Sequence, residues 1–392
     1  MTPERPVVPF AQRGTALEAG LLEAVSKAPR LLGRDSLYLL HRTPIVDEGC
    51  QEVSDVDLVS IWRRPDERPE RLAVETAIGR VLVDVLWIPA SELLDPLAAA
   101  GYMMLPHLLL ESRAVSPPSG PLASMVENVK RCARERGPWG RRLGEQVGFG
   151  DAALREASRN PDFPPAALFY LQTARSYYAM ALADARRRGV MGLLTRPMAR
   201  LRAASSPADA IDLEGAFGVG LNLEGDASPS LDALTRVHRA AAARGSASLA
   251  RSLGERVSGH YLYSISPLEL EYRKAVAGAL IRRGENAEAN LYLRFWAYSV
   301  SRCPVVLDEA RSGRKTSFYV PSRTFRESML ASCPEALDDL ATIMGGDPAA
   351  VDLRAAVDGT QAFRALALES IREAGLRPTL PGGAAPPPRR AA

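Results

Sequence analysis

The hydrophobic pattern changes its period near residues 115–121, "VSPPSGP", and this change limits the possible folds most strongly. Before it, apolar residues with helical spacing alternate with short apolar runs that are typical of strands, whereas after about residue 123 the pattern is almost purely helical. Prolines end helices and bias their neighbours toward extended conformations, so this segment is a domain boundary. We therefore predict an α+β protein with a small mixed-sheet domain and an all-helical domain, followed by a disordered proline-rich tail: 1–115, 123–375 and 376–392.

Composition excludes several classes of protein. The 392 residues are 46% hydrophobic and 24% charged, which is ordinary for a soluble globular chain. The net charge of +3 creates no overall field that calls for nucleic acid. No apolar stretch approaches the ~18 residues of a membrane span, so no membrane partner is expected. The beginning of the chain, "MTPERPVVPF", lacks a signal-peptide core.

Two further features of the composition concern the cell of origin. The four cysteines are scattered and form no C-x-x-C pair, which favours reduced buried thiols over a disulfide framework or a zinc site. Alanine and arginine are abundant and arginine greatly outnumbers lysine, as in proteins from GC-rich bacterial genomes. We therefore expect a bacterial, cytoplasmic protein.

Three apolar runs in the first part of the chain predict strands at 36–41, 55–62 and 81–89. Between the last two runs, residues 63–80 are first polar and then have a helical pattern that ends at Gly79. Helical patterns also cover 15–28 and 91–112.

The second part of the chain has its own start signals. Ser266, Pro267 and Glu269 form a capping box at the beginning of a predicted helix over 266–284. Other helices are predicted at 164–189, 286–303, 346–359 and 360–375, and a Gly/Ser/Asp-rich stretch at 204–230 is predicted to be a loop.

Three acidic residues stand in unusual places in the predicted strands. Asp55 and Asp57 are two residues apart in "SDVDLVSIW", and Asp84 is the single acid inside the apolar run "VLVDVLWIP". A carboxylate inside an apolar strand is costly unless it is paired, bound to a metal or at a sheet surface. Two neighbouring strands would bring all three carboxylates to one cleft, where they would suit Mg²⁺, a hard cation that prefers oxygen ligands. A plain polar start of a strand is the alternative for the first two acids.

The D-x-D strand, followed about one helix later by a strand with a central aspartate, resembles the DNA polymerase β-like nucleotidyltransferase superfamily. The helical region makes the chain most similar to the aminoglycoside and other small-molecule adenylyltransferases. The motifs cover about residues 15–112. This resemblance implies Mg²⁺-dependent transfer of a nucleoside monophosphate, with AMP from ATP as the expected group, to a hydroxyl of a small molecule such as an antibiotic or a natural-product intermediate. The helical domain would bind this acceptor.

The resemblance also implies roles for individual residues. Asp55 and Asp57 would be metal ligands, and Asp84 would be a third ligand that also acts in catalysis. The family has a Gly-Ser pair directly after the first strand, where this chain has "HRTP". Arg42 could pair with a phosphate and Thr43 could supply a hydroxyl, so these residues and Ser54 are the candidate nucleotide-binding residues.

Two other functions remain open. Because "HRTP" replaces Gly-Ser, the chain could be a degenerate nucleotidyltransferase that serves as a non-catalytic binding or regulatory module. The basic segment 131–142 and "DARRRG" would suit an enzyme acting on RNA ends, although a solvated helix end is the simpler interpretation of the former. The aromatic residues of the helices are interpreted as core, with an acceptor pocket as the alternative.

Overall fold

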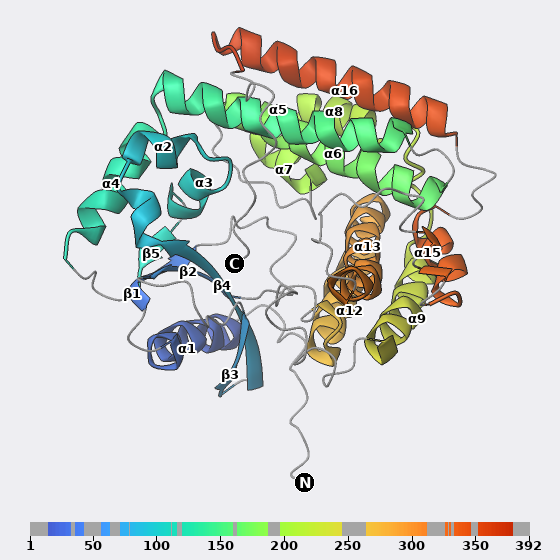
Figure 1. The fold of residues 1–392 in the computed structure, drawn as a ribbon, viewed down its shortest axis with the longest axis horizontal. Helices are drawn as coiled ribbons and strands as arrows, with labels where there is room; N and C mark the ends of the chain where they lie inside the picture. The colour runs from blue at the N-terminus through green and yellow to red at the C-terminus, as the bar shows by residue number, and fades with distance from the viewer. Residues whose placement is uncertain are drawn as a thin grey trace. The chain divides into compact units, whose positions relative to one another are not determined.

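A computed structural model of the chain gives the fold (Figure 1). It describes residues 15–32, 36–42, 56–62, 71–77, 79–110, 112–115, 120–159, 163–186, 197–244, 264–311, 326–327, 329–330, 333–345 and 352–378. The described residues form two compact units, one up to Glu145 and the other from Gln146 to Gly375. The division falls inside helix α5 (Arg136–Arg159).

The first unit contains a five-stranded sheet and several helices. In chain order its elements are α1 (Thr15–Leu32), β1 (Ser36–Arg42), β2 (Val56–Trp62), β3 (Arg71–Thr76), β4 (Gly79–Pro89), the 3₁₀ helix η1 (Ala90–Leu93), α2 (Pro96–Gly101), α3 (Leu105–Leu110), β5 (Ser112–Ala114) and α4 (Leu122–Cys132). The strand order is β3-β4-β2-β1-β5. Only β2 and β4 pair in parallel, while the other pairs are antiparallel. The predicted α+β class with a small mixed sheet is confirmed.

Helix α1 covers one face of this sheet. Its buried residues Ala24, Val25 and Ala28 belong to one apolar cluster with alternate residues of the strands, among them Val56, Leu58, Val83 and Val85. Side chains alternate between the two faces of a strand, so this cluster fixes which residues of β2 and β4 point toward α1 and which point away from it. The predicted strands at 36–41, 55–62 and 81–89 correspond to β1, β2 and β4.

Strand β3 corrects the helical pattern expected within 63–80. Residues Arg71–Thr76 pair antiparallel with β4 and form its hairpin partner. Leu72 and Val74 alternate with exposed residues and pack into the cluster under α1. The apolar residues of this short segment fit the two-residue period of a strand as well as the period of a helix. Pairing with the long apolar strand β4 stabilises the strand.

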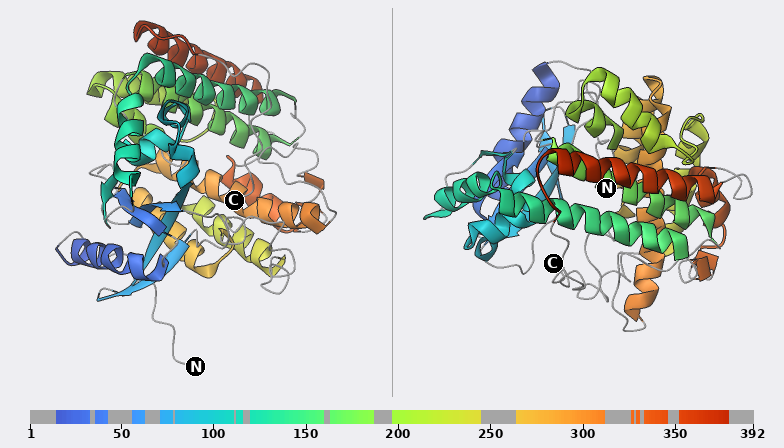
Figure 2. Two further views of the ribbon diagram at one scale, coloured as in Figure 1. Left: turned by 60° about the vertical axis from the view of Figure 1, so that its left-hand side comes forward. Right: turned by 90° about the horizontal axis from the view of Figure 1, so that it is seen from above.

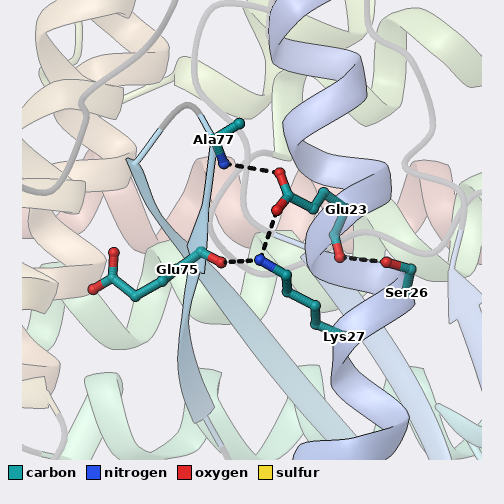
Figure 3. Close-up of polar contacts among 5 residues, drawn as sticks. All are labelled: Glu23, Ser26, Lys27, Glu75 and Ala77. Atoms are coloured by element: carbon teal, nitrogen blue, oxygen red, sulfur yellow. Dashed lines mark hydrogen bonds and ion pairs between the residues drawn. The ribbon is translucent and has the colours of Figure 1, made fainter.

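Polar contacts fasten α1 to the turn of the β3–β4 hairpin (Figure 3). The Ala77 backbone N–H donates to Glu23 Oε2 at 2.8 Å. Lys27 Nζ donates to Glu23 Oε1 at 2.6 Å and to the Glu75 carbonyl at 2.7 Å. The bond from Ala77, followed by the one from Lys27, lowers the pKa of Glu23 below its ordinary value of 4.5. These contacts anchor the hairpin strand that carries Asp84.

This pKa shift predicts an acid-dependent loss of stability. The lowered pKa means that ionised Glu23 favours the folded state at pH values above 4.5, and that this contribution disappears as pH falls through the lowered pKa. Glu23→Gln should lower the thermal midpoint at pH 7, and its difference from the wild type should shrink as the pH falls below 4.5. Thermal unfolding across this pH range measures both. A difference that stays constant with pH would show that the charge of Glu23 has no part in it.

The second unit is entirely helical in its described residues. After the end of α5, its helices are α6 (Pro164–Ala185), α7 (Pro197–Ala204), α8 (Pro207–Gly218), α9 (Ser228–Arg244), α12 (Pro267–Arg282), α13 (Asn286–Arg311), α15 (Ala336–Ile343) and α16 (Leu353–Glu373). Helix α6 lies centrally and is buried along almost its whole length, with α16 packed along it (Figure 2). The predicted helix start is confirmed, because the Glu269 backbone N–H donates to Ser266 Oγ at 3.2 Å at the N-cap of α12. The Glu269 carboxylate accepts from Arg273 Nε at 2.6 Å.

Two sequence predictions in this unit are wrong. The expected loop at 204–230 contains α8, which starts with a Ser206 cap, Pro207 in the first turn and an acid in that turn. The two helices expected on either side of Gly359 are one helix, α16. Gly359 lies inside this helix, where neighbouring side chains occupy the space that a larger residue would need. A Cβ at this position would lie 2.9 Å from Arg175 Nη2 and 3.0 Å from a methyl group of Val219.

Arg175 on α6 joins three parts of the helical unit from a fully buried position. Its Nε donates to Thr360 Oγ1 at 2.8 Å, and its Nη2 donates to the carbonyls of Val219 and Ala356 at 2.7 Å each. Its Nη1 also donates to the Phe217 carbonyl. Burial lowers its pKa to about 10, so it stays charged at neutral pH. The guanidinium thus ties α6 to α16 and to the end of α8.

Arg294 on α13 is a second buried arginine with only carbonyl partners among the described residues. It donates to the carbonyls of Leu221, Asn222 and Ile343 at 2.6, 2.8 and 3.1 Å. Burial lowers its pKa to about 10. Arg175 therefore binds the beginning of the turn that follows α8, and Arg294 binds its end, where Asn222 has a positive φ of 49°.

Within the described parts of the chain, no helix has the length and apolarity that crossing a membrane requires.

Candidate functional site

Asp57 and Asp84 lie side by side on neighbouring strands. Strands β2 and β4 run parallel, and their register pairs Asp57 with Asp84 directly. Adjacent strands are about 4.8 Å apart, and residues in register on neighbouring strands point to the same face. The two carboxylates that the sequence singled out in separate motifs are therefore brought together.

Both aspartates lie on the sheet face opposite α1. Their sequence neighbours Val56, Leu58, Val83 and Val85 belong to the cluster with α1, so the alternation of the strands turns Asp57 and Asp84 away from it. If the aspartate stood one residue earlier or later in β4, its side chain would point into the apolar cluster under α1.

Burial changes along this second face. At the level of the aspartates the side chains are half-buried, whereas Val59, Ile61 and Ile88 further along the strands are buried. The 3₁₀ helix η1 contacts β4, and α3 contacts β1. The aspartate pair thus lies at the half-buried end of a face whose other end is packed.

Two arginines flank the aspartates in the backbone register. Arg71 of β3 pairs with Asp84 from the other side of β4. His41 of β1 pairs with Leu58, so Arg42 is one residue further along, level with Asp57, and it also pairs with Ser112 of β5. Sequence reasoning selected Arg42 but missed Arg71, because only the hairpin pairing of a segment expected to be helical brings Arg71 level with Asp84.

The other predicted site residues have different outcomes. Thr43, Ser54 and Asp55 lie outside the described residues, so their roles stay predictions. Within the described residues, no group of three or more His, Cys, Asp or Glu side chains could hold a metal ion. Two of the three predicted metal ligands, Asp57 and Asp84, are therefore placed together, and the third is not placed.

The strand that ends at Arg42 differs from a phosphate-binding turn. His41 takes part in sheet pairing on both sides, with Leu58 of β2 and with Arg113 of β5. A glycine-serine turn would leave backbone N–H groups available to a phosphate, whereas these residues belong to a paired strand up to Arg42. Recognition of a phosphate at this end of β1 would thus depend on Arg42 and the residues after it.

The basic segment 131–142 is in part structural. Arg142 is buried and donates to the carbonyls of Ala100 and Ala133 at 3.0 and 3.3 Å. Arg141 donates to the Leu97 carbonyl at 2.7 Å. These arginines hold α2 and the end of α4 against α5. The segment is therefore not simply the solvated helix end of the simpler interpretation, since Arg142 is buried, and the two arginines are engaged with backbone carbonyls rather than available to nucleic acid.

The helical aromatic residues lie in the core. Phe169 of α6 stacks on Tyr298 of α13 with ring centroids 3.7 Å apart, and the Tyr298 hydroxyl hydrogen-bonds that of Tyr170 at 2.8 Å. All three rings are buried, so the interpretation of these residues as core is supported.

Comparison with known proteins gives a weak structural likeness. No family model matches the sequence, and no curated protein matches it. Among solved structures, the chain is similar to a nucleotidyltransferase-like protein from Exiguobacterium sibiricum 255-15, with 11% identity over 83% of this chain and 91% of that one, at a TM-score of 0.28. A TM-score this low does not establish a shared fold.

Proposed function

We propose that this chain is a Mg²⁺-dependent nucleotidyltransferase of the DNA polymerase β-like type, which transfers a nucleoside monophosphate from an NTP to a hydroxyl of a small molecule. The observation that carries the proposal is the register of Asp57 with Asp84 on parallel strands, on the half-buried face away from α1. A pair of carboxylates at this spacing is the minimum that such chemistry needs. AMP from ATP is the expected group, and an antibiotic or a natural-product intermediate is the expected class of acceptor.

The residues fit a hard divalent cation. Asp57 and Asp84 offer only oxygen ligands from strands about 4.8 Å apart, and Asp55 precedes Asp57 by two residues. These three residues would hold Mg²⁺, which supplies charge neutralisation and Lewis acidity at the transferred phosphate.

The protein's own groups would have three tasks in the transfer. The acceptor oxygen forms a bond to the α-phosphorus of the NTP while the bond from that phosphorus to the bridging oxygen breaks, and pyrophosphate leaves with the electron pair. Asp84 accepts the proton of the acceptor hydroxyl. Arg42 and Arg71, which flank the carboxylates in the backbone register, would bind phosphate oxygens, a task suited to the planar guanidinium group.

A second candidate function is a non-catalytic nucleotide-binding or regulatory module on the same fold. The observation that favours it is the continuous pairing of β1 through His41, where the family has a Gly-Ser turn. Loss of that turn removes backbone donors for a triphosphate while leaving the carboxylate pair intact.

Titration calorimetry with ATP, UTP, CTP and GTP, each with and without Mg²⁺, distinguishes the candidates. The proposed function predicts that at least one nucleotide binds only when Mg²⁺ is present, and that pyrophosphate release follows on addition of hydroxyl compounds. Nucleotide binding without pyrophosphate release from any small acceptor or from tRNA would support the binding module. Release with tRNA alone would support an RNA-end enzyme, and absence of nucleotide binding would refute the proposal.

A further inference from the structure

A basic surface groove of about 350 Å³ lies in the helical unit, between the last part of α5 and the middle of α16. These two helices run alongside each other in both views (Figures 1 and 2). The polar side chains that line the groove come from one face of each helix: Asp151, Arg155, Ser158, Arg159, Gln361 and Arg364. On α5, Asp151 and Arg155 are four residues apart, and Ser158 and Arg159 follow three and four residues later, so they lie along one face of the helix.

Two of the residues that line the groove form an ion pair, and a buried tyrosine also contacts it. Arg364 Nε and Nη2 donate to the two carboxylate oxygens of Asp151 at 2.6 and 3.0 Å. The buried Tyr178 hydroxyl donates to Asp151 Oδ1 at 2.7 Å. Gly150 permits this contact, since a Cβ there would lie 2.4 Å from the Tyr178 ring. Asp151 thus has both oxygens engaged and offers little repulsion to an incoming anion.

The other two arginines of the groove have little or no negative charge paired with them among the described residues. Within the part of the chain that the structure describes, Arg155 has no ion-pair partner, and it is exposed. Arg159 is 69% exposed and meets Glu156 only at 3.9 Å. With Arg364 balanced by Asp151, the groove has a net positive charge and several guanidinium N–H groups that can donate to a ligand.

We propose that this groove binds a small organic phosphate, a phosphate monoester, through Arg155 and Arg159, with Arg364 and Gln361 as further donors. Guanidinium groups match the geometry of phosphate oxygens in paired hydrogen bonds. Its volume of about 350 Å³ is within the range of small-ligand sites. The Tyr178–Asp151–Arg364 contacts hold one wall in position before a ligand arrives, which lowers the entropy cost of binding. This groove belongs to the helical unit, whereas the aspartate pair belongs to the first unit.

Calorimetry of the full chain with ribose 5-phosphate, in EDTA, tests the proposal. Ribose 5-phosphate should bind and ribose should not, because the phosphate supplies the recognition. The double variant Arg155→Ala/Arg159→Ala should weaken binding at least tenfold. Arg239→Ala removes an exposed arginine of α9 that is not in the groove, and it should leave the affinity unchanged. Asp57→Asn should also bind as the wild type does, even if the proposed transferase activity is absent.

Several results would overturn the proposal. These are no binding of ribose 5-phosphate, equal binding of ribose, or unchanged affinity in the double variant when its circular dichroism spectrum is that of the wild type. A single-stranded oligonucleotide provides the other arm of the test. If it binds through Arg155 and Arg159 while ribose 5-phosphate does not, the groove is a nucleic-acid contact instead.

Discussion

Asp57→Asn should abolish nucleotide transfer and Mg²⁺-dependent nucleotide binding while leaving the fold intact. The substitution keeps the size of the side chain but removes one of the two charges that the register places together on the half-buried part of the sheet face. A hard cation loses most of its affinity when a carboxylate ligand becomes a neutral amide. We expect a decrease in turnover of about 100-fold or more, consistent with removal of electrostatic stabilisation in an active site. Pyrophosphate release and calorimetry measure the two effects.

Two other substitutions of a carboxylate by an amide accompany this prediction, one at the register partner and one at an exposed residue. Asp84→Asn should behave as Asp57→Asn does, because the two residues are register partners. Glu127→Gln, at a residue whose side chain is 68% exposed on α4, should retain full activity. Normal turnover in Asp57→Asn would mean that "SDVDLVSIW" is an ordinary strand with a polar start, and that its resemblance to a nucleotidyltransferase is accidental.

Arg175→Met should destabilise the helical unit by about 3 to 5 kcal/mol, because a buried polar group that loses its partner costs about 1 to 3 kcal/mol and several carbonyls depend on this guanidinium. Methionine fills similar space but leaves the carbonyls of Phe217, Val219 and Ala356 without the donor that they have now. Arg175→Lys should also be destabilising, since an ammonium group lacks the planar fork that reaches acceptors on both sides. Denaturant unfolding followed by circular dichroism measures these losses.

The matched control is Arg239→Met on α9. Arg239 is exposed, and a surface substitution of this kind should change the free energy of unfolding by no more than about 0.5 kcal/mol. A loss below about 1 kcal/mol for Arg175→Met would show that water or another group takes over the carbonyls, and that the arginine is not what holds the end of α8.

Local sequence signals were reliable where they were strong. The apolar runs around Asp57 and Asp84 became β2 and β4, and the N-cap at Ser266 started α12. They failed where tertiary contacts outweighed local preference. The segment that became β3 is helical in pattern but pairs with β4, and Gly359 is inside a helix because Arg175 and Val219 need the space of its missing side chain.

By itself, the sequence determined the succession of a mixed α/β part and a helical part, and it selected Asp57 and Asp84 as unusual acids in apolar strands. Hydrophobic period and the cost of a lone carboxylate are local properties, so they can be obtained from the chain alone. Only the tertiary structure decided that β2 and β4 are parallel neighbours in a register that joins the two acids, and that Asp151 and Arg364, far apart in sequence, meet beside a groove. Strand order, register and helix packing depend on the burial of surfaces from distant segments, and no local pattern contains that information.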